Sequence, residues 1–518
     1  MGKWANVCVI LIGLGSLLVL IVAAGAEPVG AVPGNAAHPQ AAGVGGDGAA
    51  PAIDRDAAAE DVIGEATVTS GEVVTVYLPL VAHSCSILPT FATVYSSPYS
   101  SDYAFAVQQA ANGHYLVAGR AKPAGDPIYF DVWIMDLNLD GSIAWQKLYD
   151  GVRWNRARAL QSTREGGYVV LAQAGRAASA DEDVWVLKLD AGGNVTWQKS
   201  YGGTSGEEAH AIRQTADGGY VVAGTTSSFG YGGGFDAWAL RLDAEGNVVW
   251  QKTFGEGAGE GFEAIEETAD GGYVMAGDTV SYGAGAQDAW VVKLDAGGHV
   301  AWEKTYGGVQ GDKFLALQST GDGGYIPAGY TWSFGVGEWD VWVVKLGGDG
   351  NVIWQKTYGG PDDEYATAIQ QTAEGDSIVV GRTRSFGAGD DDGWALKLDA
   401  DGNVVWQKTY GGRDWDAFEA VGLVDDGGYV VTGGTYSFEE MGIWVLRLDA
   451  DGGLCTTCSL GQPSTAIPVD SSAVVADSNV VRGLSNATVL DTDATTSDTV
   501  TDLYPICICL PSPCRQAY

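Results

Sequence analysis

Residues 207–255 carry the clearest copy of a repeat, EEAHAIRQTADGGYVVAGTTSSFGYGGGFDAWALRLDAEGNVVWQKTFG. Apolar residues alternate with polar ones in four short runs, and glycine-rich segments separate these runs. Such alternation is typical of β-strands that bury one face, and Gly and Asn supply the positive φ that tight hairpin turns need. The copy therefore predicts four strands, at 209–214, 220–224, 237–242 and 248–253.

The same unit recurs with a period of about 52 residues. A Trp in a W-(Q/E)-K run marks the fourth strand of six copies, at Trp145, Trp197, Trp250, Trp302, Trp354 and Trp406. A second Trp marks the third strand of seven copies, at Trp133, Trp185, Trp238, Trp290, Trp342, Trp394 and Trp444. Four antiparallel strands in a unit of about 50 residues predict one blade of a β-propeller.

The number of blades follows from an imbalance between the strands. Seven copies of the first three strands are followed by only six W-(Q/E)-K strands. The missing strand is predicted upstream, at TFATVYSS (90–97), with Phe91 in the Trp position and Tyr95 in the Tyr position. It would complete the blade whose other strands lie in 417–448, so that the two chain ends close the ring and leave no open sheet edge. We therefore expect an all-β fold, a seven-bladed β-propeller of four-stranded antiparallel blades, over 88–452.

The segments outside the repeats differ from them in composition. Residues 1–26 combine Lys3, an apolar run and small residues, and predict a secretory signal peptide or, if uncleaved, an N-terminal membrane anchor. Residues 27–70 are rich in Ala, Gly and Pro and predict a flexible spacer. Residues 453–518, a tail rich in Ser, Thr, Val and Cys, predict either short strands or a weakly ordered stalk. We expect the protein to be secreted or held at the cell surface.

Charge restricts the choice of partners. The chain has 65 Asp and Glu against 28 Lys and Arg, a formal net charge of −37. Such a surface repels polyanions, so a nucleic-acid partner is disfavoured. A protein, a glycan or a cationic ligand remains compatible with it. We expect a monomer that contacts a membrane only through an uncleaved N-terminal segment.

Six cysteines follow the N-terminal segment, namely Cys85, Cys455, Cys458, Cys507, Cys509 and Cys514. In an oxidising compartment an even number of cysteines predicts disulfides. A bond from Cys85 to Cys455 or Cys458 would staple the ring shut, because these cysteines flank the two ends of the repeats. The alternative is a zinc ion bound by Cys455, Cys458, Cys507 and Cys509.

The unit GGYVVAGTTSSFG…DAWALRLDAEGNVVWQKT resembles the propeller-type repeats of secreted and surface proteins of bacteria and archaea. This resemblance implies the fold over 88–452 and no shared activity. The segment from the third strand through LDA…G…W also resembles the tryptophan-docking motif of pyrroloquinoline-quinone dehydrogenases. The turn here is one residue shorter, lacks the usual Thr, and no adjacent cysteine pair is present. The resemblance therefore implies only that the W-(Q/E)-K tryptophans lock neighbouring blades.

Candidate ligand-binding residues lie in the loops. Three tryptophans break the repeat there and are predicted to contact a ligand, namely Trp332, Trp339 and Trp415. An Asp precedes the third strand in most copies, as at Asp236, Asp288, Asp340 and Asp392. These carboxylates predict either a crown that binds Ca²⁺ or a cationic ligand, or caps that accept backbone N–H bonds from their own loops.

The sequence lacks the common catalytic motifs GxSxG, HExxH and GxxxxGK[ST]. We therefore expect a non-catalytic extracellular or cell-surface binding or scaffold module that uses its loop-rich acidic face. We expect no cofactor, with Ca²⁺ as the alternative. The alternative is a secreted enzyme, either a carboxylate-based hydrolase or a quinone-type oxidoreductase. It would need non-repeated polar residues and perturbed carboxylates at one mouth of the central channel.

Overall fold

The structure is a computed structural model that describes 8–14, 17–23, 90–97, 101–122, 129–151, 154–175, 182–230, 232–438, 441–454 and short strands between 461 and 508. The chain divides into two compact units, Met1–Val81 and Ala82–Tyr518. In the first unit the described residues form one antiparallel hairpin, β1 (Cys8–Leu14) and β2 (Leu17–Ala23).

The described part of the chain contains no helix long and apolar enough to span a membrane. Cleavage or anchoring at 1–26 stays a prediction, because much of this segment, its cleavage-like end included, lies outside the described residues. The spacer predicted at 27–70 also lies outside them.

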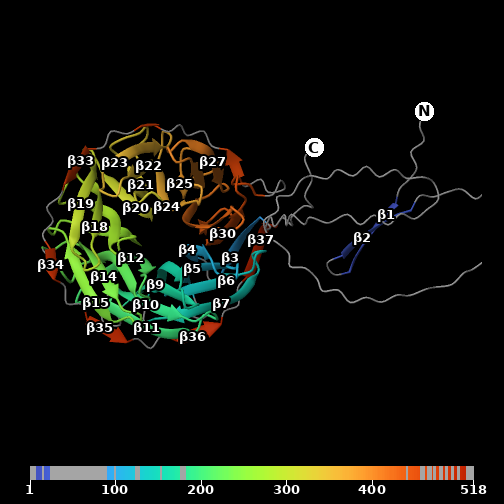
Figure 1. Ribbon diagram of the computed structural model, residues 1–518, viewed down its shortest axis with the longest axis horizontal. Helices are drawn as coiled ribbons and strands as arrows, with labels where there is room; N and C mark the ends of the chain where they lie inside the picture. Colours follow the sequence, from blue (N-terminus) through green and yellow to red (C-terminus); the bar gives the residue numbers. More distant parts are fainter. Residues whose placement is uncertain are drawn as a thin grey trace, which may run out of the picture. The chain divides into compact units, whose positions relative to one another are not determined.

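The second unit contains seven antiparallel sheets arranged as the blades of a β-propeller (Figure 1). Blades 1 and 2 are β4 (Tyr103–Gln109), β5 (Tyr115–Ala121), β6 (Asp131–Leu137), β7 (Ile143–Asp150), and β8 (Arg156–Ser162), β9 (Tyr168–Gly175), β10 (Glu182–Leu189), β11 (Val195–Gly202). Blades 3 and 4 are β12 (Glu207–Gln214), β13 (Tyr220–Thr226), β14 (Asp236–Leu242), β15 (Val248–Phe254), and β16 (Glu260–Glu267), β17 (Tyr273–Thr279), β18 (Asp288–Leu294), β19 (Val300–Gly307).

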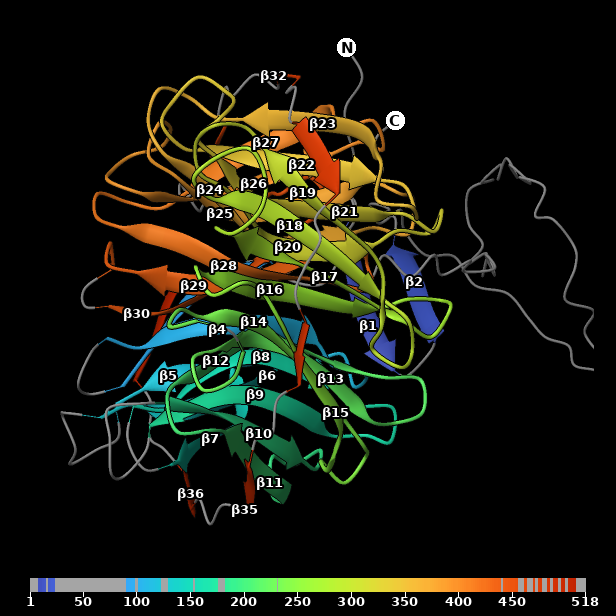
Figure 2. The same ribbon diagram turned by 90° about the vertical axis from the view of Figure 1, so that its left-hand side faces the viewer.

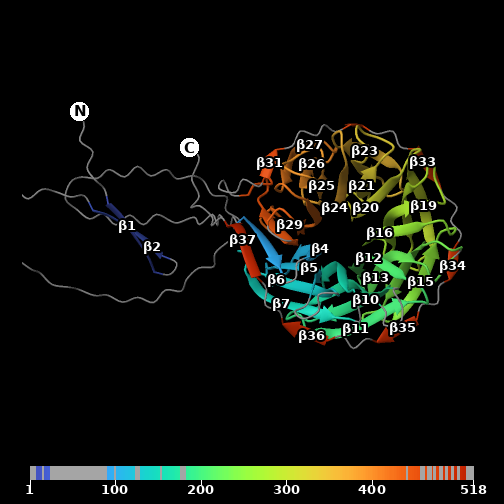
Figure 3. The same ribbon diagram turned by 180° about the vertical axis from the view of Figure 1, so that it is seen from behind.

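Blades 5 and 6 follow the same order (Figure 3). They are β20 (Asp312–Ser319), β21 (Tyr325–Thr331), β22 (Asp340–Leu346), β23 (Val352–Tyr358), and β24 (Glu364–Gln371), β25 (Ser377–Thr383), β26 (Asp392–Leu398), β27 (Val404–Tyr410). Blade 7 takes its first three strands from the end of the repeats and its fourth from the beginning, as β28 (Asp416–Leu423), β29 (Tyr429–Thr435), β30 (Gly442–Leu448) and β3 (Phe91–Ser96).

The predicted closure of the ring is confirmed. Strand β3 pairs antiparallel with β30, so that Phe91 lies opposite Arg447. Trp406 lies opposite Lys397 in the same way in blade 6, so Phe91 does occupy the Trp position. The Tyr95 hydroxyl donates to the Gly141 carbonyl oxygen at 2.5 Å, just as Tyr hydroxyls of other fourth strands donate to turns of the next blade.

The hydrophobic core lies between neighbouring blades, because each cluster of buried side chains combines residues of two of them. The third-strand tryptophans are the largest side chains in it; Trp290, for example, is 0% exposed and stacks on Phe262 at 5.1 Å. Fourth-strand tryptophans lie nearer the rim. The Trp302 indole N–H donates to the Gly348 carbonyl oxygen of the next blade at 3.1 Å, and Trp197, Trp354 and Trp406 make the same contact.

These contacts join each blade to the next, as expected for blade-locking tryptophans. The specific likeness to quinone-dependent propellers stays a prediction.

The tail adds a fifth strand to the outer edge of every blade (Figures 1 and 2). Its strands are β31 (Gly461–Pro463), β32 (Val469–Asp470), β33 (Val474–Asp477), β34 (Arg482–Leu484), β35 (Thr488–Asp491), β36 (Thr495–Asp498) and β37 (Asp502–Ile508). Of the two structures considered for the tail, short strands are therefore observed here. The expectation that ring closure alone leaves no open edge was wrong, because closure pairs strands within blade 7 and leaves the outer edge of each fourth strand free for the tail.

Among the candidate disulfide residues, Cys507 lies in β37, opposite Ala92 of β3. The other five, Cys85, Cys455, Cys458, Cys509 and Cys514, lie outside the described residues. The disulfide that would staple the ring and the alternative zinc site therefore stay predictions.

Candidate functional site

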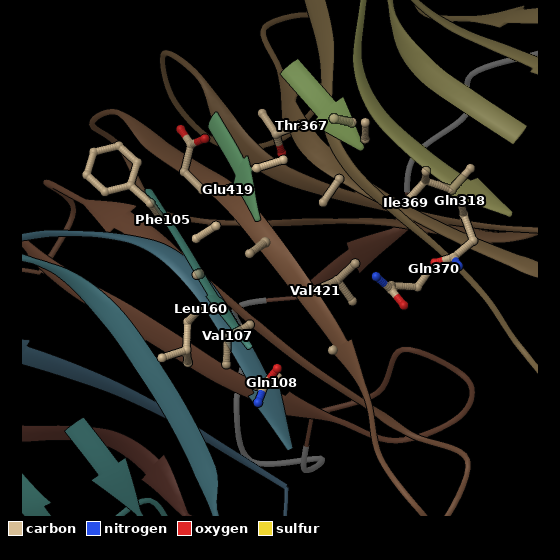
Figure 4. A pocket seen from close by; sticks show the side chains of 18 of the residues that line it. Phe105, Val107, Gln108, Leu160, Gln318, Thr367, Ile369, Gln370, Glu419 and Val421 are labelled. Carbon is tan, nitrogen blue, oxygen red and sulfur yellow. The ribbon is translucent and has the colours of Figure 1, made fainter. Parts of the chain in front are cut away.

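The first strand of each blade lines a central channel with a volume of about 610 Å³. Residues of all seven first strands border it, from β4 around the ring to β28. In Figure 4, Phe105, Thr367 and Glu419 lie toward one end of this pocket, and Gln108 and Gln370 lie toward the other. Each first strand begins at a loop that enters from the preceding blade, so the first of these ends is the loop side.

A β-bulge occurs at the same position in every first strand. The register of β12 against β13, for example, skips from Ala209 to Ala211, so that no residue of β13 lies opposite His210. A bulge of this kind turns the extra side chain out of the regular alternation. The seven bulged residues border the channel and do not follow the repeat: Phe105, Arg158, His210, Glu263, Leu315, Thr367 and Glu419.

Charged side chains at the loop side form a paired network. The Glu263 carboxylate lies 3.2 Å from Nδ1 of His210 and 2.6 Å from Nζ of Lys313. Lys313 also lies 3.0 Å from a carboxylate oxygen of Asp278. Burial opposes ionisation of Glu263, but the charges of His210 and Lys313 outweigh it and lower the pKa of this carboxyl. Burial lowers the pKa of His210.

Glu419 lies in the same channel in a different environment. The Tyr103 hydroxyl donates to the Glu419 carboxylate, and no cation lies within ion-pair distance of it among the described residues. Burial raises the pKa of Glu419. The hydrogen bond from Tyr103 and the charge of the more distant Arg382 lower this pKa, but by less than burial raises it. The channel thus contains two carboxyl groups whose pKa values are shifted in opposite directions, as the enzyme alternative requires.

The structure brings two of the predicted tryptophans together. Trp332, 44% exposed, lies 5.3 Å from Trp339 between ring centroids. Trp339 in turn stacks on Tyr365 of blade 6 at 6.3 Å, and Arg382 lies 4.6 Å from the centre of that tyrosine ring. These side chains form an aromatic surface across blades 5 and 6.

Trp415 lies in blade 7, separate from this pair. Its ring is 5.9 Å from that of Tyr103, the residue that donates to Glu419, and 6.0 Å from the exposed ring of Tyr436. The third predicted tryptophan therefore packs against the first residue of β4, at the loop-side end of that channel-lining strand.

The four predicted aspartates are buried, each at most 2% exposed. Oδ2 of Asp340 accepts the backbone N–H groups of Val336 and Gly337 at 3.0 and 3.2 Å. Asp392 and Asp288 each accept two loop N–H groups in the same way, and Asp236 lies at the equivalent position. This geometry suits the loop-capping interpretation. Within the described residues, no group of three or more His, Cys, Asp or Glu side chains could hold a metal, and binding of Ca²⁺ stays a prediction.

Two of these aspartates predict an unusual dependence of stability on pH. Burial raises the pKa of Asp340 and of Asp392 from 3.8 to about 6, more than the loop N–H groups lower it. The folded protein therefore keeps protons that the unfolded chain releases between about pH 4 and pH 6, so this contribution to stability is lost as the pH rises through 6. We expect the Tm of the native chain to fall by about 2–4 °C over this range relative to a variant with Asp340→Asn and Asp392→Asn, whose amides can still accept the loop bonds. Thermal melts of both proteins from pH 4 to 7.5 measure this, and a constant difference in Tm would contradict it.

The sequence interpretation missed the channel residues Glu263, His210 and Glu419. Alignment of the seven first strands contained a signal for them, because the flanking alanines and aliphatic residues recur from copy to copy and these positions do not. That signal has a physical meaning only once the bulges show that these positions face the channel.

The fold and its channel define the class of this protein, a seven-bladed β-propeller. No protein-family model and no curated protein matches the chain. Among solved structures it is similar to Sqt1 from Chaetomium thermophilum, with 13% identity, a TM-score of 0.43 and coverage of 73% of this chain and 89% of that one.

Two further solved structures are similar over part of the chain. For puromycin hydrolase the identity is 13% and the TM-score 0.42, over 72% of this chain and 57% of that one. For a eukaryotic initiation factor the identity is 8% and the TM-score 0.30, over 58% and 77%. Similarity at this level concerns the fold alone.

Proposed function

We propose that this protein is an exported, non-catalytic binding module that takes a glycan at the loop-side mouth of its channel. One observation carries the proposal. Trp339 packs on Tyr365 and Trp415 packs on Tyr103, and both tyrosines stand at the loop-side start of a first strand whose bulged residue borders the channel.

The chemistry of the mouth suits a neutral polar ligand. Exposed aromatic rings pack against the apolar faces of sugar rings, and carboxylates and ammonium groups bind hydroxyl groups. Most charged groups there have a partner of opposite sign, because Lys313 is paired with Glu263 and Asp278, and Arg158 lies 3.8 Å from Glu208. These pairs leave less charge for a strongly cationic or anionic ligand than the acidity of the whole chain suggests.

A glycan array probed with the full chain tests the proposal. We expect binding to a restricted set of glycans, and an affinity about tenfold or more lower for the variant Trp332→Ala/Trp339→Ala. Ile353→Ala is the matched control, since Ile353 is 61% exposed on the outer strand of the same blade. Absence of glycan binding, or equal losses in variant and control, would contradict the proposal; binding of polycations instead would favour the acidic loop face.

A second function, a carboxylate-based hydrolase, is favoured by two carboxyl groups that border the same channel, Glu419 and Glu263, and whose pKa values are shifted in opposite directions. Glu419 would donate a proton to a leaving group, and ionised Glu263 would act as base or nucleophile. Assays of the bound glycans for cleavage separate the two functions. A hydrolase loses at least about a hundredfold in turnover with Glu419→Gln while it still binds, whereas a binding module shows no turnover in either protein.

A further inference from the structure

The seven strands β31–β37, here called the belt, visit the blades in reverse order. They pair in turn with β27, β23, β19, β15, β11, β7 and β3, the outermost strands of blades 6, 5, 4, 3, 2, 1 and 7. The position of β3 is consistent with this reverse order. Strand β3 already pairs with the edge of β30 as the fourth strand of blade 7, and the chain that follows β30 forms β31, which pairs with the outer edge of β27 in the neighbouring blade 6 (Figure 3).

The sequence of the belt has a period of its own. Residues 459–507 divide into seven heptads, SLGQPST, AIPVDSS, AVVADSN, VVRGLSN, ATVLDTD, ATTSDTV and TDLYPIC. The fifth position is Asp in four of them, and a Ser or Thr follows it in the first six. One belt strand begins in each heptad, and each belt strand pairs with one blade, so one heptad covers one blade.

The register joins this period to that of the blades. The four aspartates at the fifth position, Asp470, Asp477, Asp491 and Asp498, lie opposite Lys356, Lys304, Lys199 and Lys147 in that order. These are the lysines of the W-(Q/E)-K runs. Opposite charges at directly paired positions of an antiparallel sheet attract, whereas a shift of one residue would separate them.

The lysines are held in place by the blades themselves. Nζ of Lys147 donates to Asn194 in the next blade at 2.7 Å, and Lys199, Lys304 and Lys356 donate to the equivalent Asn residues. Each of these four fourth strands thus presents a fixed ammonium group beside an edge of backbone N–H and C=O groups. An edge of this kind pairs with any extended chain unless it is covered.

We propose that each heptad of the belt pairs with one blade and that the Asp–Lys pairs set the register of this pairing. The belt thereby covers the outer edges of the blades, so that second copies of this chain cannot pair with them. The belt therefore has a role distinct from ligand binding in the channel. Without it, the rim is a docking surface for extended strands, and the monomer gives way to larger assemblies.

Charge reversal in the full chain tests the proposal. The variant carries Asp470→Lys, Asp477→Lys, Asp491→Lys and Asp498→Lys, and its control carries Glu245→Lys, Glu256→Lys, Glu338→Lys and Glu374→Lys at exposed positions of the blades. We expect hydrogen exchange of backbone amides in β7, β11, β19 and β23 to become at least about tenfold faster in the variant, with first-strand amides unchanged. Light scattering should show species larger than a monomer in the variant and a monomer in the control.

A second variant, in which the charge pairs are restored with opposite polarity, distinguishes loss of the Asp–Lys pairs from general misfolding. It adds Lys147→Asp, Lys199→Asp, Lys304→Asp and Lys356→Asp to the four reversed aspartates, which exchanges the charges of every pair. Protection of the fourth strands and the monomeric state should return. Unchanged exchange in the first variant, an equal loss of protection in the control, or no recovery on restoration would each overturn the proposal.

Discussion

Replacement of Trp290 by Ala is expected to lower the free energy of unfolding by about 3–5 kcal/mol. The side chain is 0% exposed and stacks on Phe262 at 5.1 Å, and its ring centre lies 6.4 Å from that of Tyr282. Removal of the indole leaves a cavity between closely packed strands, which neighbouring side chains fill only in part. Equilibrium denaturation in urea, followed by circular dichroism, measures the loss.

Trp302→Ala is the matched control for this prediction. Trp302 recurs with the same period but lies on a fourth strand, where its indole N–H binds the Gly348 carbonyl oxygen at 3.1 Å near the surface. Water can replace that bond after truncation, so we expect a loss of about 1–2 kcal/mol. Equal losses for the two tryptophans would contradict the conclusion that the third-strand series dominates the packing.

Asp426→Ala is expected to lower the free energy of unfolding by about 3–5 kcal/mol, because it leaves a buried charge without its partner. The Arg447 guanidinium is 1% exposed and donates to the Asp426 carboxylate. Its Nε also donates to the Tyr115 hydroxyl of blade 1 at 3.0 Å. The pair therefore lies where the ring closes, and chemical denaturation of the full chain measures its removal.

The equivalent pair in blade 3 is the control. Arg241 binds Asp217 and the Tyr273 hydroxyl in the same arrangement, but the Asp217 side chain is 71% exposed, against 15% for Asp426. Arg241 is buried as well, but water reaches Asp217 and screens its charge, so we expect Asp217→Ala to lower stability by only about 1 kcal/mol. A loss as large as that of Asp426→Ala would show that burial does not decide the contribution of these pairs.

Local pattern was sufficient to predict the blades and their number. The alternation of Ala209 and Ala211 with polar neighbours such as His210, and the recurring tryptophans, are short-range signals of each copy. Even the distant closing strand could be predicted, because Phe91 and Tyr95 preserve the spacing of the fourth strand. Repetition also explains why Asp340 was hard to interpret, since a carboxylate that recurs in each blade suits a metal crown and a loop cap equally well until its N–H partners are known.

The candidate site depends on relations that no single copy contains. Glu263 and Lys313 lie on the first strands of different blades, and Tyr103 reaches Glu419 only because the ring brings blade 1 against blade 7. The tail likewise reads as a polar segment with two possible structures. Its heptads pair with the blades only because the fourth strands have free outer edges, and because lysines of these strands lie opposite aspartates of the heptads.

The sequence by itself determined the all-β class, the four strands of each blade, the seven copies and the strand that closes them, because hydrophobic periodicity and turn residues act within a few residues of each other. Tertiary structure alone decided which side chains meet at the channel, which carboxyl groups have a raised pKa, and where the tail lies. These features arise from burial and from charges on blades far apart in the chain, and such interactions exist only after the ring has formed.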